Sequence, residues 1–309
     1  MLNTKKIYHE PVLVKEVCDG LQIDKLALLN HQATIVDATV GFGGHSFWFV
    51  KKGLFVLGID VDEFAISECE KTLAKACPSR QHSLTGCFKL VNSNFRNIKE
   101  IVKANSITNI YGVLMDLGVS SYQLTSGLRG FSFLARDADL DMRMDKNLAV
   151  KASDVLNFFS KKELVNLFSV CVNYNYSLRI AESVISFRKT KNFATVGDFL
   201  DVLESVGLVS GKINPATLPF LALRIFVNSE LSVLENSLPD AFSVLEKGGR
   251  LAVISFHSGE DRIVKNFFNN VQKRKEGVIV NKKPILPSIE EIRLNPRARS
   301  AKLRLIEKI

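Results

Sequence analysis

The sequence predicts an α/β fold with a doubly wound parallel sheet and an inserted all-helical domain. Five apolar, strand-like runs indicate the sheet, and helical segments separate the first four of them. These runs lie at 35–40, 55–60, 88–91, 110–117 and 250–257. From about 150 to 210, apolar residues recur at helical spacing without a strand signal. We therefore expect a sheet domain at 1–135 and 215–309, and a helical domain at 136–214.

A glycine-rich turn follows the first predicted strand. The apolar run delivers Asp37 to the strand end, and Gly41, Gly43 and Gly44 then allow a ligand to approach the backbone without interference from a Cβ atom. Similar turns occur in many α/β proteins that bind nothing there. The turn alone therefore leaves both a binding role and a structural role open.

Asp60 ends the second strand-like run, before a helical segment at 61–76 that stops ahead of Pro78. A carboxylate at this position can accept hydrogen bonds from both hydroxyls of a ribose. A dinucleotide-binding fingerprint would need a glycine at the position of Ser46. This difference favours S-adenosylmethionine over NAD, because the former needs the acid and the glycines but no cradle for a pyrophosphate.

The fourth strand-like run delivers Asp116 to a strand end. A loop of small residues follows and carries Ser120, Ser121 and Gln123. In open α/β sheets, ligands bind at the carboxyl edge of the strands, which makes Asp116 a candidate site residue. A role as a turn cap is equally consistent with the pattern.

Two further segments carry candidate site residues. Residues 129–145 combine charged and aromatic side chains without clear periodicity, so they could hold a nucleobase by stacking or form a salt-bridged surface loop.

An apolar pattern at 220–238 predicts a helix that returns the chain to the sheet. His257 follows the fifth strand, and on sequence alone a structural role is the better interpretation of this histidine.

The composition favours a polyanionic partner such as nucleic acid. Lys and Arg number 41 against 32 Asp and Glu, which gives a net charge of +9, although solubility alone could explain an excess of this size. No apolar run approaches the ~20 residues that span a bilayer, and the N-terminal residues are polar. We therefore expect a cytoplasmic protein without a membrane partner.

The five cysteines do not indicate a disulfide framework or a zinc site. They are an odd number, contain no CxxC pair and do not cluster with histidine in the sequence. None lies beside a candidate motif, which disfavours a covalent cysteine mechanism. We expect no metal.

Nine blocks of the sequence, taken together, point to one known family. They are 9–13, 37–45, 115–121, 129–133, 140–145, 222–225, 227–231, 254–258 and 295–304. These blocks occur in order over nearly the whole chain, and they resemble the ribosomal RNA small subunit methyltransferase H family, also called MraW. The resemblance is weakest through the helical insert.

This resemblance implies a Rossmann-like class I methyltransferase sheet with a helical substrate-recognition insert. It also implies transfer of a methyl group from S-adenosylmethionine to the exocyclic N4 of a cytidine in the decoding region of 16S rRNA. The expected substrate is the assembled small ribosomal subunit, and the expected oligomeric state is a monomer or a homodimer. Neither a metal nor an active-site cysteine is required.

The resemblance also assigns cofactor contacts to residues of this chain. They are Gly43, Gly44, His45, Asp60, Phe95, Asp116 and Gln123. Asp116 is in addition the hypothetical acceptor for a hydrogen of the reacting amine, with a backbone carbonyl in 117–120 as the alternative. The candidate substrate contacts are Phe131, Phe133, Asp141, Arg143, Asp145, His257, Arg297 and Arg299.

The chain departs from the family pattern at three places. Residues 134–139 form a segment one residue longer than usual and lack a customary proline, 173–179 replace a usual Tyr-Gly-Glu-Glu, and Gly259 replaces a usual leucine. Three alternatives stay open: a non-catalytic RNA-binding factor for ribosome assembly, a methyltransferase for a different RNA site, and a nicotinamide oxidoreductase.

Overall fold

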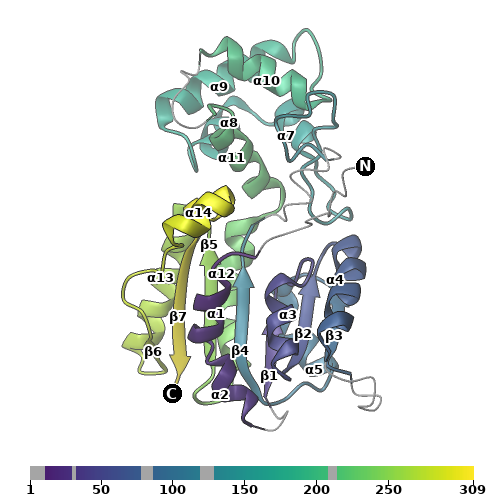
Figure 1. Cartoon of the computed structure of the whole chain (residues 1–309). Helices are drawn as coiled ribbons and strands as arrows, with labels where there is room; N and C mark the ends of the chain where they lie inside the picture. The colour runs from purple at the N-terminus through teal and green to yellow at the C-terminus, as the bar shows by residue number, and fades with distance from the viewer. Residues whose placement is uncertain (1–10, 30–32, 78–85, 119–128, 208–213) are drawn as a thin grey trace. The chain divides into compact units, whose positions relative to one another are not determined.

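A computed structural model describes residues 11–29, 33–77, 86–118, 129–207 and 214–309. The chain divides into two compact units (Figure 1). Residues 1–118 and 231–309 form the first, which we call the sheet unit. Residues 119–230 form the second, which we call the helical unit.

In the described part of the chain, the sheet unit contains a seven-stranded sheet of order β3-β2-β1-β4-β5-β7-β6. Neighbouring strands from β3 to β5 pair in parallel, whereas β7 is antiparallel to both β5 and β6. The strands are β1 (Thr34–Asp37), β2 (Phe55–Asp60), β3 (Phe88–Asn92), β4 (Ile110–Asp116), β5 (Arg250–Ser255), β6 (Gly277–Ile279) and β7 (Lys302–Lys308). The five predicted strands are confirmed, and the antiparallel pair at the edge is added to them.

Helices cover both faces of this sheet, as expected for a doubly wound fold. They are α1 (Val14–Gly20), α2 (Ile23–Ala27), α3 (Gly44–Lys51), α4 (Glu63–Ala76), α5 (Ile98–Ala104), α12 (Glu230–Ser243), α13 (Ser258–Lys273) and α14 (Ile289–Leu294). Two short 3-10 helices, η1 (Phe95–Asn97) and η2 (Pro296–Ser300), complete the described elements of this unit. Residues alternate between the two faces along each strand, so Ile35 packs with α1 to α4 and Val36 packs with α5, α12 and α13.

The helical unit has its own hydrophobic core, and its helices are drawn in teal and green in Figure 1. Its described helices are α7 (Ala152–Phe158), α8 (Lys161–Phe168), α9 (Tyr174–Phe187), α10 (Val196–Ser205) and α11 (Thr217–Val227). Helix starts follow local capping signals: Ser160 and Glu163 form a capping box on α8, and Thr195 and Asp198 form one on α10. Phe168, on α8, stacks on Phe199, on α10, with ring centroids 5.9 Å apart.

The helical unit is larger than the sequence predicts. The expected limits at 136 and 214 become 119 and 230, because the segment before 136 and helix α11 both contribute to its core. Phe131 and Leu140 are buried there with Phe220. The predicted helix at 220–238 is also divided, since α11 ends before α12 begins.

One disulfide corrects the expectation drawn from the cysteine spacing. Cys77 ends α4 and Cys87 precedes β3, and the two are joined with their Cα atoms 6.0 Å apart. The pairing depends on the packing of α4 beside β3, which the spacing of the cysteines does not reveal.

None of the described helices is by itself long and apolar enough to cross a membrane. The bent pair α11 and α12 meets that criterion of length and composition only when both helices are taken together.

Alanine substitutions at two glycines with similar backbone angles should have different costs in unfolding free energy. Gly130 has φ +70°, and an added Cβ would lie 2.5 Å from the backbone oxygen of Asp139. Gly248 has φ +79°, and an added Cβ would meet no atom of the described residues within 4 Å. Each alanine substitution should cost ~1 kcal/mol for the left-handed conformation, and Gly130→Ala should cost about 1–3 kcal/mol more for the steric clash. Hydrogen exchange measured for each unit checks this prediction. An equal loss of unfolding free energy in the two variants would contradict it.

Candidate active site

Three acidic residues end three neighbouring strands of the sheet. Asp60 ends β2, Asp37 ends β1 and Asp116 ends β4. Because these strands are adjacent and parallel, the three carboxyl groups lie at the same edge of the sheet. Ligands of open α/β sheets bind at this carboxyl edge.

Asp60 holds the glycine-rich turn against β2. Its two carboxylate oxygens accept hydrogen bonds from the backbone N–H groups of Gly41 and Asp62, both at 2.9 Å. Gly43 is the N-cap of α3 with φ +83°, and an added Cβ would lie 2.9 Å from Sγ of Cys69. The turn therefore needs glycine at this position. Each carboxylate oxygen of Asp60 keeps acceptor capacity, so the predicted contact with a ribose stays open.

Asp37 is a site residue whose bonding the sequence analysis missed. It is 2% exposed, and Oγ of Ser46 donates a hydrogen bond of 2.6 Å to its Oδ2. Thr39 links it to the next strand, because its backbone N–H donates to Asp37 Oδ1 while its Oγ1 accepts from the N–H of Asp116 at 2.6 Å. The available signal was a serine in the first turn of the helix that follows a strand-end aspartate.

Asp116 has a buried polar atom available for a ligand. Among the described residues, its Oδ1 has no hydrogen-bond partner. Its Oδ2 lies 3.7 Å from Nδ1 of His45, which is too far for a hydrogen bond. Nε2 of His45 donates to the carbonyl oxygen of Val12 at 2.8 Å, which fixes the imidazole beside the carboxyl group.

Burial raises the pKa of all three carboxyl groups. The pKa of Asp116 rises to about 8, mainly through burial and further through the negative charges of Asp37 and Glu260. Burial also raises the pKa values of Asp37 and Asp60 to about 6. Such a cluster favours a cationic ligand, because a positive charge stabilises the carboxylates. The sulfonium of S-adenosylmethionine satisfies this requirement, whereas the pyrophosphate of NAD would add negative charge.

Other predicted cofactor contacts lie near this edge or outside the described residues. Gly44 begins α3, and an added Cβ would lie 3.0 Å from Pro11. Phe95 begins η1 and packs partly against the core on the α5 face of the sheet. Gln123 lies outside the described residues. These contacts remain predictions.

His257 caps a helix, in agreement with the structural interpretation. Its Nδ1 accepts hydrogen bonds from the N–H groups of Gly259 and Glu260, at 3.2 and 3.4 Å. In return, Oε2 of Glu260 accepts from the N–H groups of Phe256 and His257. The ring therefore fixes the start of α13, and its predicted contact with substrate stays a prediction.

The aromatic candidates of the helical unit serve its packing. Phe131 is buried in the core, and the Arg129 guanidinium lies 5.8 Å from its ring centroid. Phe133 meets Phe220 edge to face at 6.0 Å. Stacking of either ring on a base would compete with these contacts.

The charged candidates of the same unit stabilise their own loop. Arg143 and Asp141 form a two-point ion pair, with distances of 2.7 and 2.9 Å. Nη1 of Arg143 also donates to the carbonyl oxygen of Leu148, and Asp145 accepts from the N–H of Asn147. This bonding supports the salt-bridged interpretation of the loop, and the substrate contacts stay predictions.

The two basic candidates near the C-terminus differ in exposure from the neighbouring Arg304. Arg297 and Arg299 are exposed on η2, where phosphates could reach them. Arg304 lies in β7, is largely buried and forms a two-point ion pair with Asp261 at 2.7 and 3.2 Å. Its guanidinium therefore joins β7 to α13. It is less accessible to a phosphate than the side chains of Arg297 and Arg299.

Replacing Asp116 should stabilise the protein without ligand in a pH-dependent way. The folded protein holds the Asp116 proton between the ordinary pKa of 3.8 and about 8, where the unfolded chain has lost it, so the wild type loses stability as pH rises through this window. Asp116→Asn removes this titration. We therefore expect the gain in free energy of unfolding to be larger at about pH 9 than at about pH 5, as measured by denaturant unfolding.

Asp261→Asn is the matched control with the opposite sign. Burial opposes ionisation of Asp261, but the hydrogen bond from Arg304 and the positive charges of Arg304, Lys302 and Lys265 together outweigh it and hold the pKa of Asp261 below its ordinary value. This pair therefore contributes stability at neutral pH that is lost in acid. The substitution should destabilise most at neutral and higher pH, and the same pH trend in both variants would contradict the assignment.

Known proteins resemble this chain over almost its full length. "Ribosomal RNA small subunit methyltransferase H" of Acetivibrio thermocellus is 38% identical, over 97% of this chain and 99% of that protein. The protein of the same name from Persephonella marina is 41% identical, over 98% of this chain and 100% of that protein. A crystal structure of an rRNA methylase from Streptococcus thermophilus is 13% identical, covers 94% of this chain and 95% of its own, and has a TM-score of 0.44.

A sequence profile of the MraW methylase family matches residues 6–309. This match includes all the strands of the sheet and the three acids at its edge. The chain therefore belongs to the MraW methylase family, and it is an S-adenosylmethionine-dependent methyltransferase.

Proposed function

We propose that this protein methylates the exocyclic N4 of a cytidine in the decoding region of 16S rRNA, within the assembled small ribosomal subunit. The names of its relatives support a small-subunit rRNA as the substrate. A ribosomal substrate in turn supports a cytoplasmic location. The choice of atom rests on one observation: among the described residues, Oδ1 of Asp116 has no hydrogen-bond partner.

An acceptor at this place meets the chemical need of the reaction. The lone pair of N4 is delocalised into the cytosine ring, so the amine is a poor nucleophile. A carboxylate oxygen that accepts an N4 hydrogen increases the electron density on nitrogen and orients the amine. Asp116 Oδ1 is buried at the carboxyl edge of β4 and can supply that contact.

The residues of the sheet edge would bind the cofactor and accept the proton. S-adenosylmethionine supplies an electrophilic methyl group on a positively charged sulfur. Asp60 and the turn with Gly43 and Gly44 hold the ribose and the amino-acid part, and Phe95 packs on the adenine. Asp116 in its carboxylate form holds the N4 hydrogen and receives the proton that leaves after methyl transfer. Burial raises the pKa of Asp116 to about 8 in the free protein, and the positive charge of the bound cofactor would favour the carboxylate form that the reaction needs.

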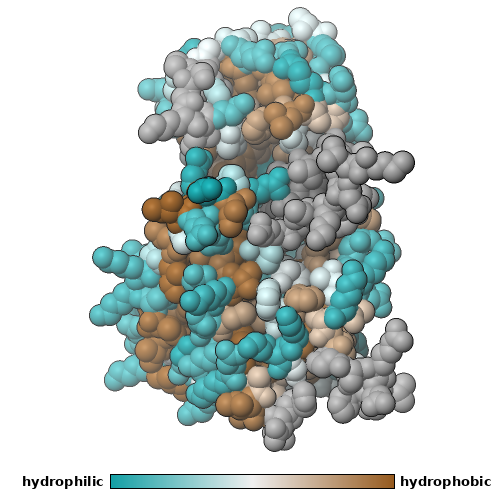
Figure 2. All heavy atoms as spheres, in the orientation of Figure 1, coloured by the Kyte–Doolittle hydropathy of each residue, from teal (hydrophilic) through white to brown (hydrophobic). Residues whose placement is uncertain are grey.

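Basic residues near the C-terminus support binding to rRNA. Between 251 and 309 the sequence has 13 Lys and Arg against six Asp and Glu. On the face shown in Figure 2, hydrophilic side chains are interspersed with hydrophobic ones over α13 and β6. The exposed Arg297 and Arg299 belong to this segment. Positive charge of this kind supplies affinity for phosphates without sequence preference.

The product of the reaction tests the proposal. The purified protein, labelled S-adenosylmethionine and undermethylated small subunits should yield N4-methylcytidine by nucleoside mass spectrometry. Asp116→Asn should lower kcat by about 100-fold or more at saturating cofactor, because it removes the proton acceptor. Asp24→Asn, an exposed residue paired with Lys52, is the matched control and should keep wild-type kcat.

Three results would contradict parts of this proposal. A methylated nucleoside other than N4-methylcytidine would exclude the assigned target atom. Normal kcat for Asp116→Asn with weakened cofactor binding would leave Asp116 as a binding residue only. Cofactor binding without any methylated RNA would favour the RNA-binding assembly factor.

Cofactor affinity should increase with pH up to about 8. The free protein holds a proton on Asp116 below that pH, and a bound cation favours the carboxylate, so binding releases the proton. Calorimetry in two buffers with different ionisation enthalpies measures this release. Asp116→Asn should release fewer protons than the wild type at about pH 7, while titration of the cofactor itself is common to both proteins. Equal release would show that Asp116 is already ionised in the free protein.

A further inference from the structure

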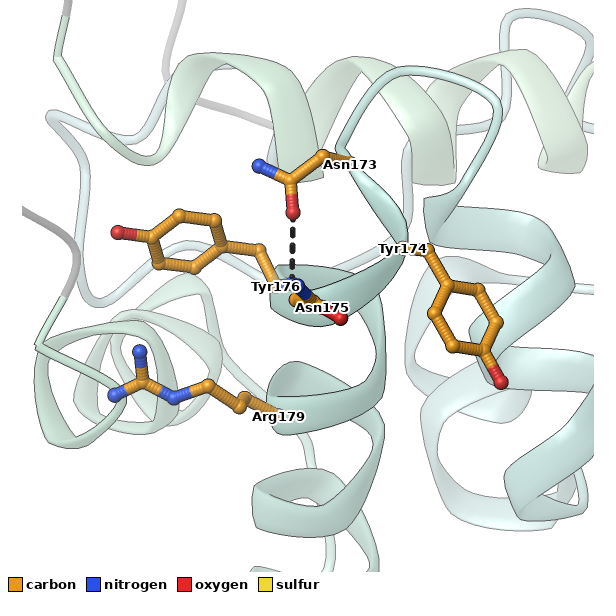
Figure 3. A pocket seen from close by; sticks show the side chains of 5 residues that line it. All are labelled: Asn173, Tyr174, Asn175, Tyr176 and Arg179. Carbon is orange, nitrogen blue, oxygen red and sulfur yellow. Dashed lines mark hydrogen bonds between the residues drawn. The ribbon is translucent and has the colours of Figure 1, made fainter.

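A pocket of about 340 Å³ lies at the beginning of α9 in the helical unit (Figure 3). Its volume is in the range of pockets that bind small organic groups. The lining residues carry two phenol rings, two side-chain amides and one guanidinium, and none of them carries a negative charge. They are Asn173, Tyr174, Asn175, Tyr176 and Arg179.

Tyr176 and Arg179 lie against each other in the lining of this pocket. The Arg179 guanidinium lies over the Tyr176 ring, 5.5 Å from its centroid, and also donates to the backbone carbonyl of Val206. The Tyr176 ring packs in part against the core of the helical unit. Both planes are therefore held in place before any ligand binds, which reduces the entropy lost on binding.

The polar groups of the pocket are also oriented. Oδ1 of Asn173 accepts a hydrogen bond of 3.0 Å from the backbone N–H of Tyr176, as the dashed line in Figure 3 shows. This bond fixes the direction of the Asn173 amide. Asn175 brings a second amide to the same lining. Side-chain amides both donate and accept hydrogen bonds, as the edges of nucleobases do.

Tyr174 lies on the other side of the first turn of α9 from Tyr176 (Figure 3). Its side chain is 64% exposed, so core packing does not explain this aromatic residue. Exposed tyrosines are typical of binding surfaces, because the ring gives apolar contact and the hydroxyl remains hydrated.

We propose that this pocket binds an unpaired base of the RNA substrate. The base stacks on the surface formed by Tyr176 and Arg179, and the amides of Asn173 and Asn175 contact its edge. Tyr174 offers a second ring for the neighbouring nucleotide. The inference rests on the proposed function for the identity of the substrate as RNA, and it adds a binding contribution from the helical unit that is independent of the cofactor.

The chemistry of the lining favours a base over a peptide. A basic peptide would need carboxylates, which the five lining residues lack, and an apolar peptide helix would need a hydrophobic groove. Aromatic rings, a guanidinium plane and amides are the groups that bind single-stranded RNA in other proteins. Double-stranded RNA keeps its bases stacked and paired, so it cannot offer one to this pocket.

Binding of a fluorescent single-stranded RNA of about 12 nucleotides tests the inference with the full-length protein. Tyr176→Leu keeps an apolar side chain but removes the ring, and we expect about tenfold weaker binding. Arg179→Lys keeps the charge but removes the plane, and it should weaken binding in the same direction. Tyr176→Phe keeps the ring and should bind RNA as the wild type does. Affinity for S-adenosylmethionine and for a duplex of the same sequence should stay unchanged in all three variants.

Tyr174→Ala guards against a folding defect in Tyr176→Leu, because Tyr174 is exposed. This variant should also weaken binding of the single strand. As a direct measurement, an oligonucleotide that contains 4-thiouridine should cross-link to residues 173–179 on irradiation, as mapped by mass spectrometry. Unchanged RNA affinity in the Tyr174, Tyr176 and Arg179 variants, together with cross-links to other residues, would overturn the inference. It would also be overturned if these substitutions weakened the binding of a protein to this pocket and left RNA binding unchanged.

The two proposals can fail separately. If the wild type produces N4-methylcytidine and the pocket variants bind RNA normally, the pocket assignment is wrong and the proposed function stands. If the pocket variants lose single-strand affinity while the wild type produces no N4-methylcytidine, the proposed function is wrong and the pocket assignment stands.

Discussion

The burial of three carboxyl groups at one edge of a parallel sheet is the constraint on which the site depends. Each group would be more stable in water, and their proximity adds repulsion between them. The fold tolerates this arrangement because backbone N–H groups and the Ser46 hydroxyl bind Asp37 and Asp60. Of the three carboxyl groups, Asp116 has the fewest hydrogen bonds from the described residues to offset its burial. A bound cation would stabilise its carboxylate form, and this stabilisation would add to the binding free energy.

The same bonds also connect the strands that position the chemistry. The link from Asp60 to Gly41 joins β2 to the turn after β1, and the link from the Asp116 N–H to Thr39 joins β4 to that turn. A ligand that contacts one of these residues therefore binds to a sheet edge in which hydrogen bonds already fix β2, β4 and the turn after β1 relative to one another. Such preorganisation is what electrostatic catalysis requires.

Much of this arrangement could be predicted, because the strands that form the site are short apolar runs that each end in an acid. The edge strand β7 is harder to predict: its pairing with β5 and β6 joins segments that the sequence pattern does not relate. The role of Ser46 was missed because it was compared only with a glycine fingerprint. The limits of the helical unit were misplaced because Phe131 and Leu140 lie in irregular segments whose burial depends on tertiary packing. The helix cap formed by His257 agrees with the structural role that the sequence favoured.

The division of the chain has a consequence for its biosynthesis. The helical unit is one continuous segment, whereas the sheet unit is made of two segments that flank it. Strand β7 lies between β5 and β6, and its Leu305 contacts the backbone at Gly20 near the beginning of the described chain. During translation the helical unit can therefore fold while the sheet is incomplete, and β7 must emerge before the sheet can close. A nascent chain that stalls before this strand would leave the backbone groups of β5 unpaired on one side, and such an edge can pair with another chain.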